Sequence, residues 1–173
     1  ELIRPILRGR DIRRYEYEWA DKYLIATFPS RHYDIELYPA VKRHLLSFGK
    51  ERLEQTGKTY SINGEKIKAR KKTHNKWFET QDSISYWEDF MRPKIIWKRI
   101  GSILRFSYDT TGNLGLDSTC FATGQHMAYL CCILNSLMGH YMFKDSPKTG
   151  TGDLLVSVQA IEPILIPMNK DME

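Results

Sequence analysis

The longest apolar segment of the chain runs from Gln125 to Phe143. Its apolar residues recur at three- and four-residue steps, which places them along one side of a helix. The residues of this stripe are Leu130, Ile133, Leu134, Leu137, Met138 and Tyr141. A helix with such a face must bury it, so we expect a core helix around which the other elements pack. Asn135 and Ser136 interrupt the segment, and because short polar side chains favour helix starts over helix interiors, we predict a bend there.

The apolar run within residues 125–143 is too short to cross a membrane. A transmembrane helix needs about 20 residues of nearly unbroken apolar character. Polar and small residues interrupt the run at Asn135, Ser136, Gly139 and His140. We therefore expect no membrane partner.

The first third of the chain predicts two strands and one helix. Alternating aromatic residues at Tyr15, Tyr17 and Trp19 indicate a strand, which leads into a second, buried strand over residues 23–28. A helix is expected to begin near Pro39, which suits a first turn, and to end before Gly57. Its expected buried stripe is Val41, Leu45 and Phe48.

Residues 92–100 predict a strand with two unlike faces. Ile95 and Trp97 alternate onto one face, and Lys94, Ile96 and Lys98 onto the other. This alternation indicates one covered face and a basic outer edge. A second strand over 102–108 should pair with the first.

Three further elements complete the expected fold. A short helix is predicted over 84–90, started by Asp82 or Ser83, and a short strand near 120–123. Two apolar runs, LLVSV and IEPILIP, close the chain, and prolines prevent a regular central strand over the last one. The pattern predicts an α+β class: a single domain with mixed or antiparallel sheets packed on a central apolar helix, and a projecting basic hairpin or loop.

That hairpin or loop is the basic insert over residues 58–76. Asn63-Gly64 is the two-residue turn that hairpins favour, because both residues tolerate positive φ. The arm after the turn is rich in lysine and carries no acidic residue between Lys66 and Lys76. A flexible basic loop on a rigid scaffold can enter a DNA groove. The competing interpretation is disorder without function.

The positive charge is concentrated in the first two thirds of the chain. The 173 residues carry a net charge of +5, with 23 Lys/Arg against 15 Asp/Glu over residues 1–110, and 3 against 6 after them. Such polarity suits a surface that faces a polyanion, although a solvated basic face gives the same count. The densest stretch is RPILRGRDIRRY near the start, which predicts either an arginine arm that holds DNA phosphates or guanine edges, or an exposed connector.

Cysteine usage and the absence of a signal peptide predict a cytoplasmic location. Cys131 and Cys132 are adjacent and Cys120 stands apart, a spacing that suits neither a disulfide framework nor a zinc site. The chain opens within sequence that resembles a folded region, so we expect a piece of a longer protein.

Motifs for catalysis are absent. No Asp-x-Lys or Glu-x-Lys occurs, so the common metal-dependent nuclease pattern is missing. The five histidines show no metal-binding spacing, and neither Gly-x-Ser-x-Gly nor a complete phosphate-binding loop is present. We expect binding without catalysis and no metal site.

Six pieces of the sequence, in order, resemble the TaqI-like C-terminal specificity domain. They are IRPILRGRDIRRY, YPAVKRHLLSF, the Trp77-Phe78 pair after the basic insert, FMRPKIIWKRI, ILNSL and IEPILIP. That domain is the target recognition part of adenine-specific DNA methyltransferases and of type IIG enzymes, which fuse restriction and modification in one chain. The resemblance covers nearly the whole chain, and its last portion is also similar to the recognition domains of type I specificity subunits.

The resemblance implies a division of labour within a bacterial restriction-modification enzyme. A separate upstream domain would bind S-adenosylmethionine and flip the target adenine into an Asn/Asp-Pro-Pro-Tyr pocket, while this part holds the duplex. Neither that motif nor the glycine motif of the cofactor site occurs here. We therefore expect no cofactor in residues 1–173. S-adenosylmethionine, and Mg where a nuclease is present, are expected in the parent protein, a site-specific adenine methyltransferase with or without a fused type II endonuclease.

Sequence-specific recognition of double-stranded DNA is thus the leading hypothesis. The alternatives are a domain that docks on an absent catalytic domain, and a nonspecific nucleic-acid binding module. Charge and loop placement select the expected DNA contacts, which are Arg4, Arg8, Arg10, Arg13, Arg14, Lys66, Lys68, Arg70, Lys71, Lys72, Lys76, Lys98 and Arg99.

Overall fold

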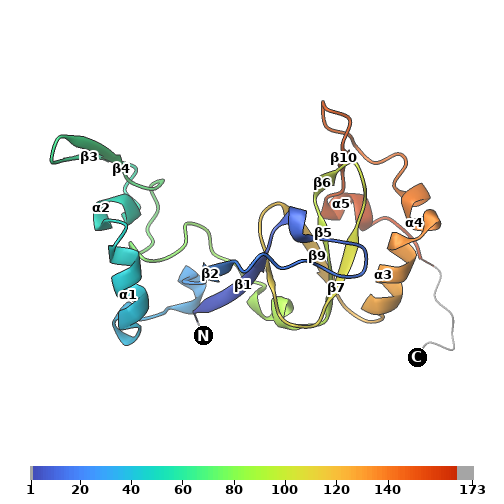
Figure 1. Cartoon of the computed structure of the whole chain (residues 1–173), viewed down its shortest axis with the longest axis horizontal. Coiled ribbons are helices and arrows are strands. Elements are labelled where there is room, and N and C mark those ends of the chain that lie inside the picture. The colour runs from blue at the N-terminus through green and yellow to red at the C-terminus, as the bar shows by residue number, and fades with distance from the viewer. Residues whose placement is uncertain (1, 167–173) are drawn as a thin grey trace. The chain divides into compact units, whose positions relative to one another are not determined.

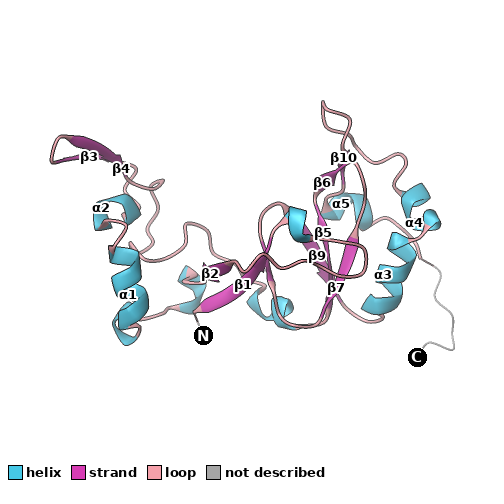
Figure 2. Cartoon of the chain, viewed as in Figure 1, coloured by secondary structure: helices cyan, strands magenta, loops and turns pink. Residues whose placement is uncertain are grey.

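A computed structural model describes residues 2–166 of the chain. Figure 1 traces the chain in colour from its N-terminus, and Figure 2 separates helices from strands. The chain forms two compact units. The first unit holds Leu24–Tyr86 and the N-terminal residues up to Arg4, and the second holds Pro5–Tyr23 and the chain from Trp87 onward. The class is α+β, as predicted.

The second unit is built on a three-stranded antiparallel sheet of order β7-β5-β9. The strands are β5 (Lys94–Lys98), β7 (Phe106–Asp109) and β9 (Thr119–Thr123). Ile95 of the central strand lies opposite Tyr108 on one side and Ala122 on the other. The predicted pairing of the strands near 92–100 and 102–108 is confirmed, and so is the short strand near 120–123.

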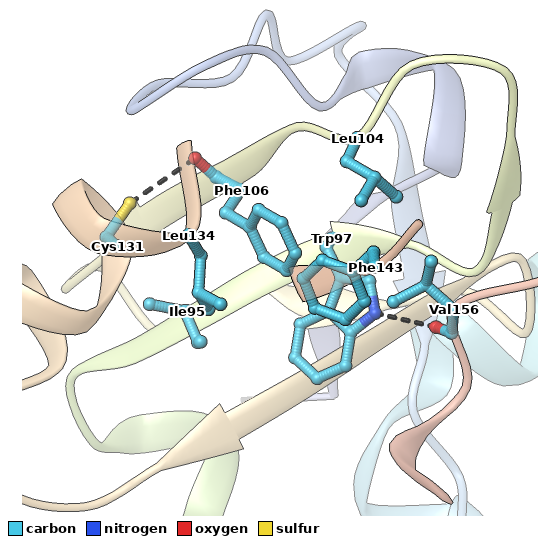
Figure 3. Packing of buried hydrophobic residues seen from close by; sticks show 8 residues of the cluster. All are labelled: Ile95, Trp97, Leu104, Phe106, Cys131, Leu134, Phe143 and Val156. Atoms are coloured by element: carbon cyan, nitrogen blue, oxygen red, sulfur yellow. Dashed lines mark hydrogen bonds between the residues drawn. The ribbon is translucent and has the colours of Figure 1, made fainter. Parts of the chain in front are cut away.

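One face of this sheet carries the main hydrophobic core. Figure 3 shows Cys131 and Leu134, from helix α3 (Met127–Asn135), beside Ile95 and Phe106 of the sheet. Trp97 closes the other end of the core, where its indole Nε1 donates to the carbonyl oxygen of Val156 at 2.8 Å. The full cluster is Ile95, Trp97, Leu104, Phe106, Cys131, Leu134, Phe143 and Val156.

The opposite face of β5 is also buried, so the predicted basic outer edge is wrong at two of its three positions. Ile96 packs in a second cluster with Leu7 and Ile12. Lys94 is fully buried, because its ammonium pairs with Asp109 Oδ2 at 2.5 Å and donates to the Phe90 carbonyl at 2.7 Å. Lys98 alone of the three is exposed. Leu7 and Ile12 of the N-terminal segment thus cover the face of β5 that the alternation of residues predicts to be exposed to solvent.

The long apolar segment bends where the sequence predicts. Helix α3 ends at Asn135, and α4 (Leu137–Met142) begins after Ser136, whose hydroxyl accepts from the Gly139 amide at 3.2 Å. The predicted single buried stripe is wrong beyond this bend. Leu137, Met138 and Tyr141 are 90%, 59% and 62% exposed, since the periodicity assumes one continuous helix axis.

The remaining elements of the second unit are short. Strand β8 (Leu114–Gly115) pairs in parallel with the end of β1 (Ile3–Leu7), and β6 (Ile100–Gly101) pairs with β10 (Leu154–Leu155). The 3₁₀ helices are η1 (Gly9–Asp11) and η4 (Trp87–Met91), and α5 spans Val158–Ile161. The helix predicted over 84–90 is therefore reduced to η4. Of the two closing prolines, Pro167 lies outside the described residues.

The expected strand over Tyr15, Tyr17 and Trp19 is absent from the described fold. Tyr15 adopts a left-handed φ of 70° and forms a bridge with the edge strand β7. Its amide donates to Phe106 O at 2.8 Å, and its carbonyl accepts from Tyr108 N at 3.1 Å. The segment thus covers the edge of β7 at one residue instead of running alongside it.

The first unit contains small elements around few buried residues. They are β2 (Tyr23–Ile25), whose first residue belongs to the second unit, η2 (Pro29–Arg31), η3 (Ile35–Leu37), α1 (Pro39–Leu46), α2 (Lys50–Leu53), β3 (Thr59–Ile62) and β4 (Glu65–Lys68). The strand expected over 23–28 is shorter, and Tyr23 is exposed.

The helix in this unit begins at Pro39 as predicted but is interrupted before α2. Gly49, with φ of 88°, separates α1 from α2. The predicted buried stripe is wrong, because Phe48 is exposed and Val41 and Leu45 are only half-buried. Strands β3 and β4 form a hairpin whose turn residues, Asn63 and Gly64, both have positive φ.

Candidate nucleic-acid interface

A cavity of about 260 Å³ in the second unit is surrounded by basic side chains. It lies between η1, the residues that follow it, and the chain from Lys98 to Arg105. Its lining residues are Gly9, Arg10, Ile12, Arg13, Lys98, Gly101, Ser102, Ile103 and Arg105. Four of these nine residues are cationic and none is acidic. We call this the cationic cavity.

The turn that carries Arg10 is held by an ion pair at its start. Arg8 donates to the Asp11 carboxylate at 2.7 Å through its guanidinium and at 2.8 Å through its backbone amide. These hydrogen bonds raise the pKa of Arg8 and lower the pKa of Asp11. Arg8 therefore shapes η1, and its guanidinium is engaged within the fold.

Gly9 brings the same turn close to the sheet. A side chain at Gly9 would meet Lys98 Cγ at 2.9 Å and the Ser118 carbonyl oxygen at 3.0 Å. The Gly9 amide donates to Ser118 Oγ at 3.0 Å. This close approach places Arg10 and Lys98 on the same cavity.

The cationic side chains differ in how far the fold neutralises them. Arg13 donates to the Arg10 carbonyl at 2.7 Å and pairs with Glu18. Within residues 2–166, Arg10, Lys98 and Arg105 form no ion pair with an acidic side chain. These three charges are available to an anion, because none of them is held in an ion pair.

A second cavity adjoins the first through a shared residue. It has a volume of about 230 Å³ and is lined by Lys98, Arg99, Ile100, Asp117 and Ser118. Lys98 lines both cavities, and the exposed Arg99 lies in the second. The predicted contacts Arg10, Arg13, Lys98 and Arg99 therefore share one region of the second unit.

The other arginines of the predicted arm lie elsewhere. Arg14 is exposed and contacts the His140 ring nitrogen Nε2 at 3.3 Å. Arg4 is half-buried in β1. Neither lines the cationic cavity.

In the first unit, five predicted lysines are exposed and stand on or near the hairpin. Lys66 and Lys68 belong to β4, and Lys71, Lys72 and Lys76 follow it. The ammonium of Lys76 lies 5.6 Å from the centroid of the Phe78 ring. The basic character of the insert is therefore presented to solvent.

Arg70 is the exception within the insert, since its guanidinium is turned into the fold. It donates to the carbonyl oxygens of Leu53 at 2.8 Å and Glu79 at 2.9 Å, and to that of Trp77. Burial lowers the pKa of Arg70. This side chain ties the return segment of the insert to α2.

Arg105 is the cavity residue that sequence reasoning did not select. The signal was present, because Leu104 and Phe106 are apolar neighbours on either side of it. Both are buried in the core, which leaves Arg105 between them facing the cavity.

Between residues 2 and 166 no group of three His, Cys, Asp or Glu residues is arranged to hold a metal ion. Burial raises the pKa of the Cys131 thiol to about 11, so it remains protonated near neutral pH. No helix in the described part of the chain is long and apolar enough to span a membrane.

A comparison with known protein families gives a match. The family model described as the TaqI-like C-terminal specificity domain matches residues 4–160. No curated protein matches the chain.

Proposed function

This chain belongs to the TaqI-like C-terminal specificity domain family, and on that premise we propose that it binds duplex DNA and recognises a specific sequence. The family suggests recognition of DNA sequence in restriction-modification enzymes. In our proposal the chain binds without catalysing. An adenine-specific, S-adenosylmethionine-dependent methyltransferase elsewhere in the parent protein performs the reaction, with a Mg-dependent nuclease in parents of the type IIG class.

The cationic cavity is the observation that carries this proposal. Arg10, Lys98 and Arg105 line it, and within the described residues none of them forms an ion pair. Arginine can hold a phosphate through two parallel donors, and lysine through its ammonium. We assign these side chains to backbone phosphates, which fix the position of a protein on DNA.

The lysines of the insert supply the second set of contacts in this proposal. Lys66, Lys68, Lys71 and Lys72 are exposed and carry long, flexible side chains. Arg70 donates hydrogen bonds to three carbonyl groups of the first unit. These bonds hold the backbone from which the neighbouring lysines extend. Phosphate contacts from this unit would add affinity without reading bases.

The salt dependence of DNA binding tests the cavity. The logarithm of the affinity should fall with the logarithm of the salt concentration, by a slope of about 0.9 per phosphate contacted. The double variant Arg10→Ala/Arg105→Ala is expected to bind more weakly and to reduce that slope by about 2. Fluorescence anisotropy with a labelled duplex over a salt series measures both quantities.

The matched control removes the same charge from another surface. Lys144 and Lys148 are exposed and lie outside the cavity, so Lys144→Ala/Lys148→Ala changes the net charge equally. This control should keep the wild-type slope. An identical loss in both double variants would mean that only net charge matters, and the cavity would lose its role.

Selection from a random duplex pool separates specific from nonspecific binding. Bound duplexes should converge on one consensus sequence, in the chain or in its parent protein. A pool that remains random after repeated selection, with normal salt dependence, would favour the nonspecific module over the proposed function.

The exposed apolar face of α4 favours one further role, contact with the catalytic part of the parent chain. Leu137, Met138 and Tyr141 are exposed among the described residues. Exposed apolar clusters commonly mark interaction sites, so this face is a candidate contact. In the parent enzyme, Leu137→Glu should lower the methylation rate. In the isolated chain it should change neither the free energy of unfolding by more than about 0.5 kcal/mol nor the DNA affinity. An unchanged methylation rate would exclude this contact.

A further inference from the structure

A third cavity of the second unit is lined mainly by aromatic side chains instead of cations. It has a volume of about 250 Å³ and lies beside the turn that follows β7. Its lining residues are Pro5, Tyr17, Trp19, Tyr23, Thr111 and Asn113. We call this the aromatic cavity. None of its residues belongs to the cationic cavity.

Two of its rings remain open to solvent. Trp19 and Tyr23 are 38% and 56% exposed, and their ring centroids lie 5.0 Å apart in an edge-to-face arrangement. Large aromatic side chains gain free energy by burial, so an exposed pair beside a cavity offers a surface that a flat ligand can cover.

Hydrogen bonds hold the cavity walls in place before any ligand arrives. The Trp19 indole donates to the Lys22 carbonyl at 3.1 Å. The Tyr17 hydroxyl lies 3.0 Å from Thr111 Oγ1 and donates to Asp109 Oδ1 at 3.3 Å. Asp109 is itself fixed by the buried ion pair with Lys94. The site is therefore preorganised, which reduces the entropy lost when a ligand binds.

Asn113 supplies a directed polar group at this cavity. It is only 5% exposed, and its amide nitrogen donates to Asp109 Oδ1 at 3.1 Å and to Thr111 Oγ1 at 2.7 Å. Both amide hydrogens are thus engaged, and the carboxylate fixes which end of the amide faces it. Within residues 2–166, the Asn113 Oδ1 accepts no hydrogen bond. At the wall of a cavity, an acceptor without a protein donor favours a ligand that donates an N–H group.

The charge of the cavity argues against a cationic ligand. No acidic residue lines it among the described residues, and the carboxylate of Asp109 is already neutralised by Lys94. Hydrogen bonds from Lys94 and Thr111 outweigh the burial that would raise the pKa of Asp109, and its pKa lies below the usual value. An ammonium ligand would find aromatic rings but no countercharge.

We infer that the aromatic cavity binds an unpaired nucleobase that carries an exocyclic amino group. The base stacks on the face of one of the two perpendicular rings, Trp19 or Tyr23, and contacts the other ring with its edge. Its amino group donates to Asn113 Oδ1. This inference rests on the proposed function, since the base that it names belongs to the DNA that the chain binds. Stacking of a base on aromatic side chains is tolerant of sequence. Thymine offers the acceptor only its ring N3–H and no exocyclic amino group, so we expect the site to bind it less tightly than adenine.

Duplexes with one bulged nucleotide test this inference. The probes are a fully paired duplex and the same duplex with a bulged deoxyadenosine, thymidine or abasic site, the last of which controls for flexibility. Wild-type protein should bind the deoxyadenosine bulge about 5- to 100-fold more tightly than the abasic bulge. The thymidine bulge should fall between them.

Two cavity variants and one control locate the effect. Trp19→Ala and Tyr23→Ala should each lose the preference for the deoxyadenosine bulge while their affinity for the paired duplex stays within about twofold of wild type. Tyr141→Ala, which removes an exposed ring on α4, should keep the preference. A preference that survives both cavity variants, or that is absent from wild type, overturns the inference.

A fluorescence measurement keeps the two proposals distinguishable. A short deoxyadenosine homopolymer should quench tryptophan emission more in wild type than in Trp19→Ala. Failure of the proposed function would appear as no salt-dependent binding of the paired duplex. Failure of the inference would appear as equal quenching in the two proteins, whether or not they bind the duplex.

Discussion

Replacing Lys94 by methionine is expected to lower the free energy of unfolding by about 3–5 kcal/mol. The ammonium of Lys94 is fully buried and pairs with Asp109, which is also buried. Methionine fills a similar volume but leaves the Asp109 carboxylate without its cation in a low-dielectric site. Urea denaturation followed by tryptophan fluorescence measures the loss.

Lys98→Met is the matched control, because it makes the same substitution on the same strand at an exposed position. Its expected effect on unfolding is within about 0.5 kcal/mol. A loss below about 1 kcal/mol for Lys94→Met would contradict the assignment of a buried, mutually dependent pair.

The pH dependence of this variant follows from the sign of the Asp109 shift. The pKa of Asp109 is lowered in the folded protein, so its contribution to wild-type stability is present above the ordinary aspartate pKa of 3.8 and is lost as the pH falls through the folded pKa. Without Lys94, burial should raise the pKa of the same carboxyl. The variant then gains stability as the pH falls from neutral toward about 4, where its folded state can protonate Asp109. The stability gap between wild type and variant should narrow over that range.

Asn135→Leu is expected to cost about 1–3 kcal/mol of unfolding free energy. The Asn135 side chain matches the outer edge of β7, since its Oδ1 accepts from the Phe106 amide at 3.0 Å and its Nδ2 donates to the Phe106 carbonyl at 2.7 Å. Leucine would leave the buried Phe106 amide without an acceptor. The Phe106 carbonyl would keep its bond from Tyr15.

Hydrogen exchange at a single amide distinguishes this mechanism from general loosening of the core. In Asn135→Leu, the Phe106 amide should lose more protection than other amides of β5 and β7. Cys132→Ala, an exposed substitution on the same helix, serves as the control and should leave protection and stability unchanged. Uniform loss across the sheet would argue against a local role for Asn135.

The sequence predicts those elements whose signals are local. The bend at Asn135-Ser136 follows from two short polar side chains inside an apolar run, and the structure shows Ser136 capping α4. The hairpin turn at Asn63-Gly64 is equally local, because it depends only on residues that tolerate positive φ.

Burial depends on partners distant in sequence, and there the predictions fail. Lys94 can be buried because its ammonium forms an ion pair with Asp109 on the neighbouring strand. Leu137 is exposed because the bend redirects α4, which a periodicity read along one axis does not include. Neither outcome can be obtained from the spacing of residues alone.

At the candidate site too, the sequence predicts local features but not which distant residues meet. The concentration of arginine near the start identified Arg10 and Arg13, and the basic strand identified Lys98, but nothing in the sequence indicated that they meet at one cavity. Arg8 and Arg70 are in the predicted set yet have engaged guanidinium groups, one with Asp11 three residues later and the other with backbone carbonyls. The sequence does not indicate that Arg70 binds backbone carbonyl groups, because every residue has one. It does show an acidic residue, Asp11, three positions after Arg8.

The arrangement of the two units has a consequence for synthesis on the ribosome. Because Leu24–Tyr86 lies within the sequence of the second unit, Pro5–Tyr23 emerges long before the strands it packs against. Until β5 has been translated, Leu7 and Ile12 have no Ile96 to pack against, so their apolar side chains stay exposed and accessible to chaperones. A slow stretch of codons after Tyr86 would lengthen that exposure, and the yield of folded protein should fall with it.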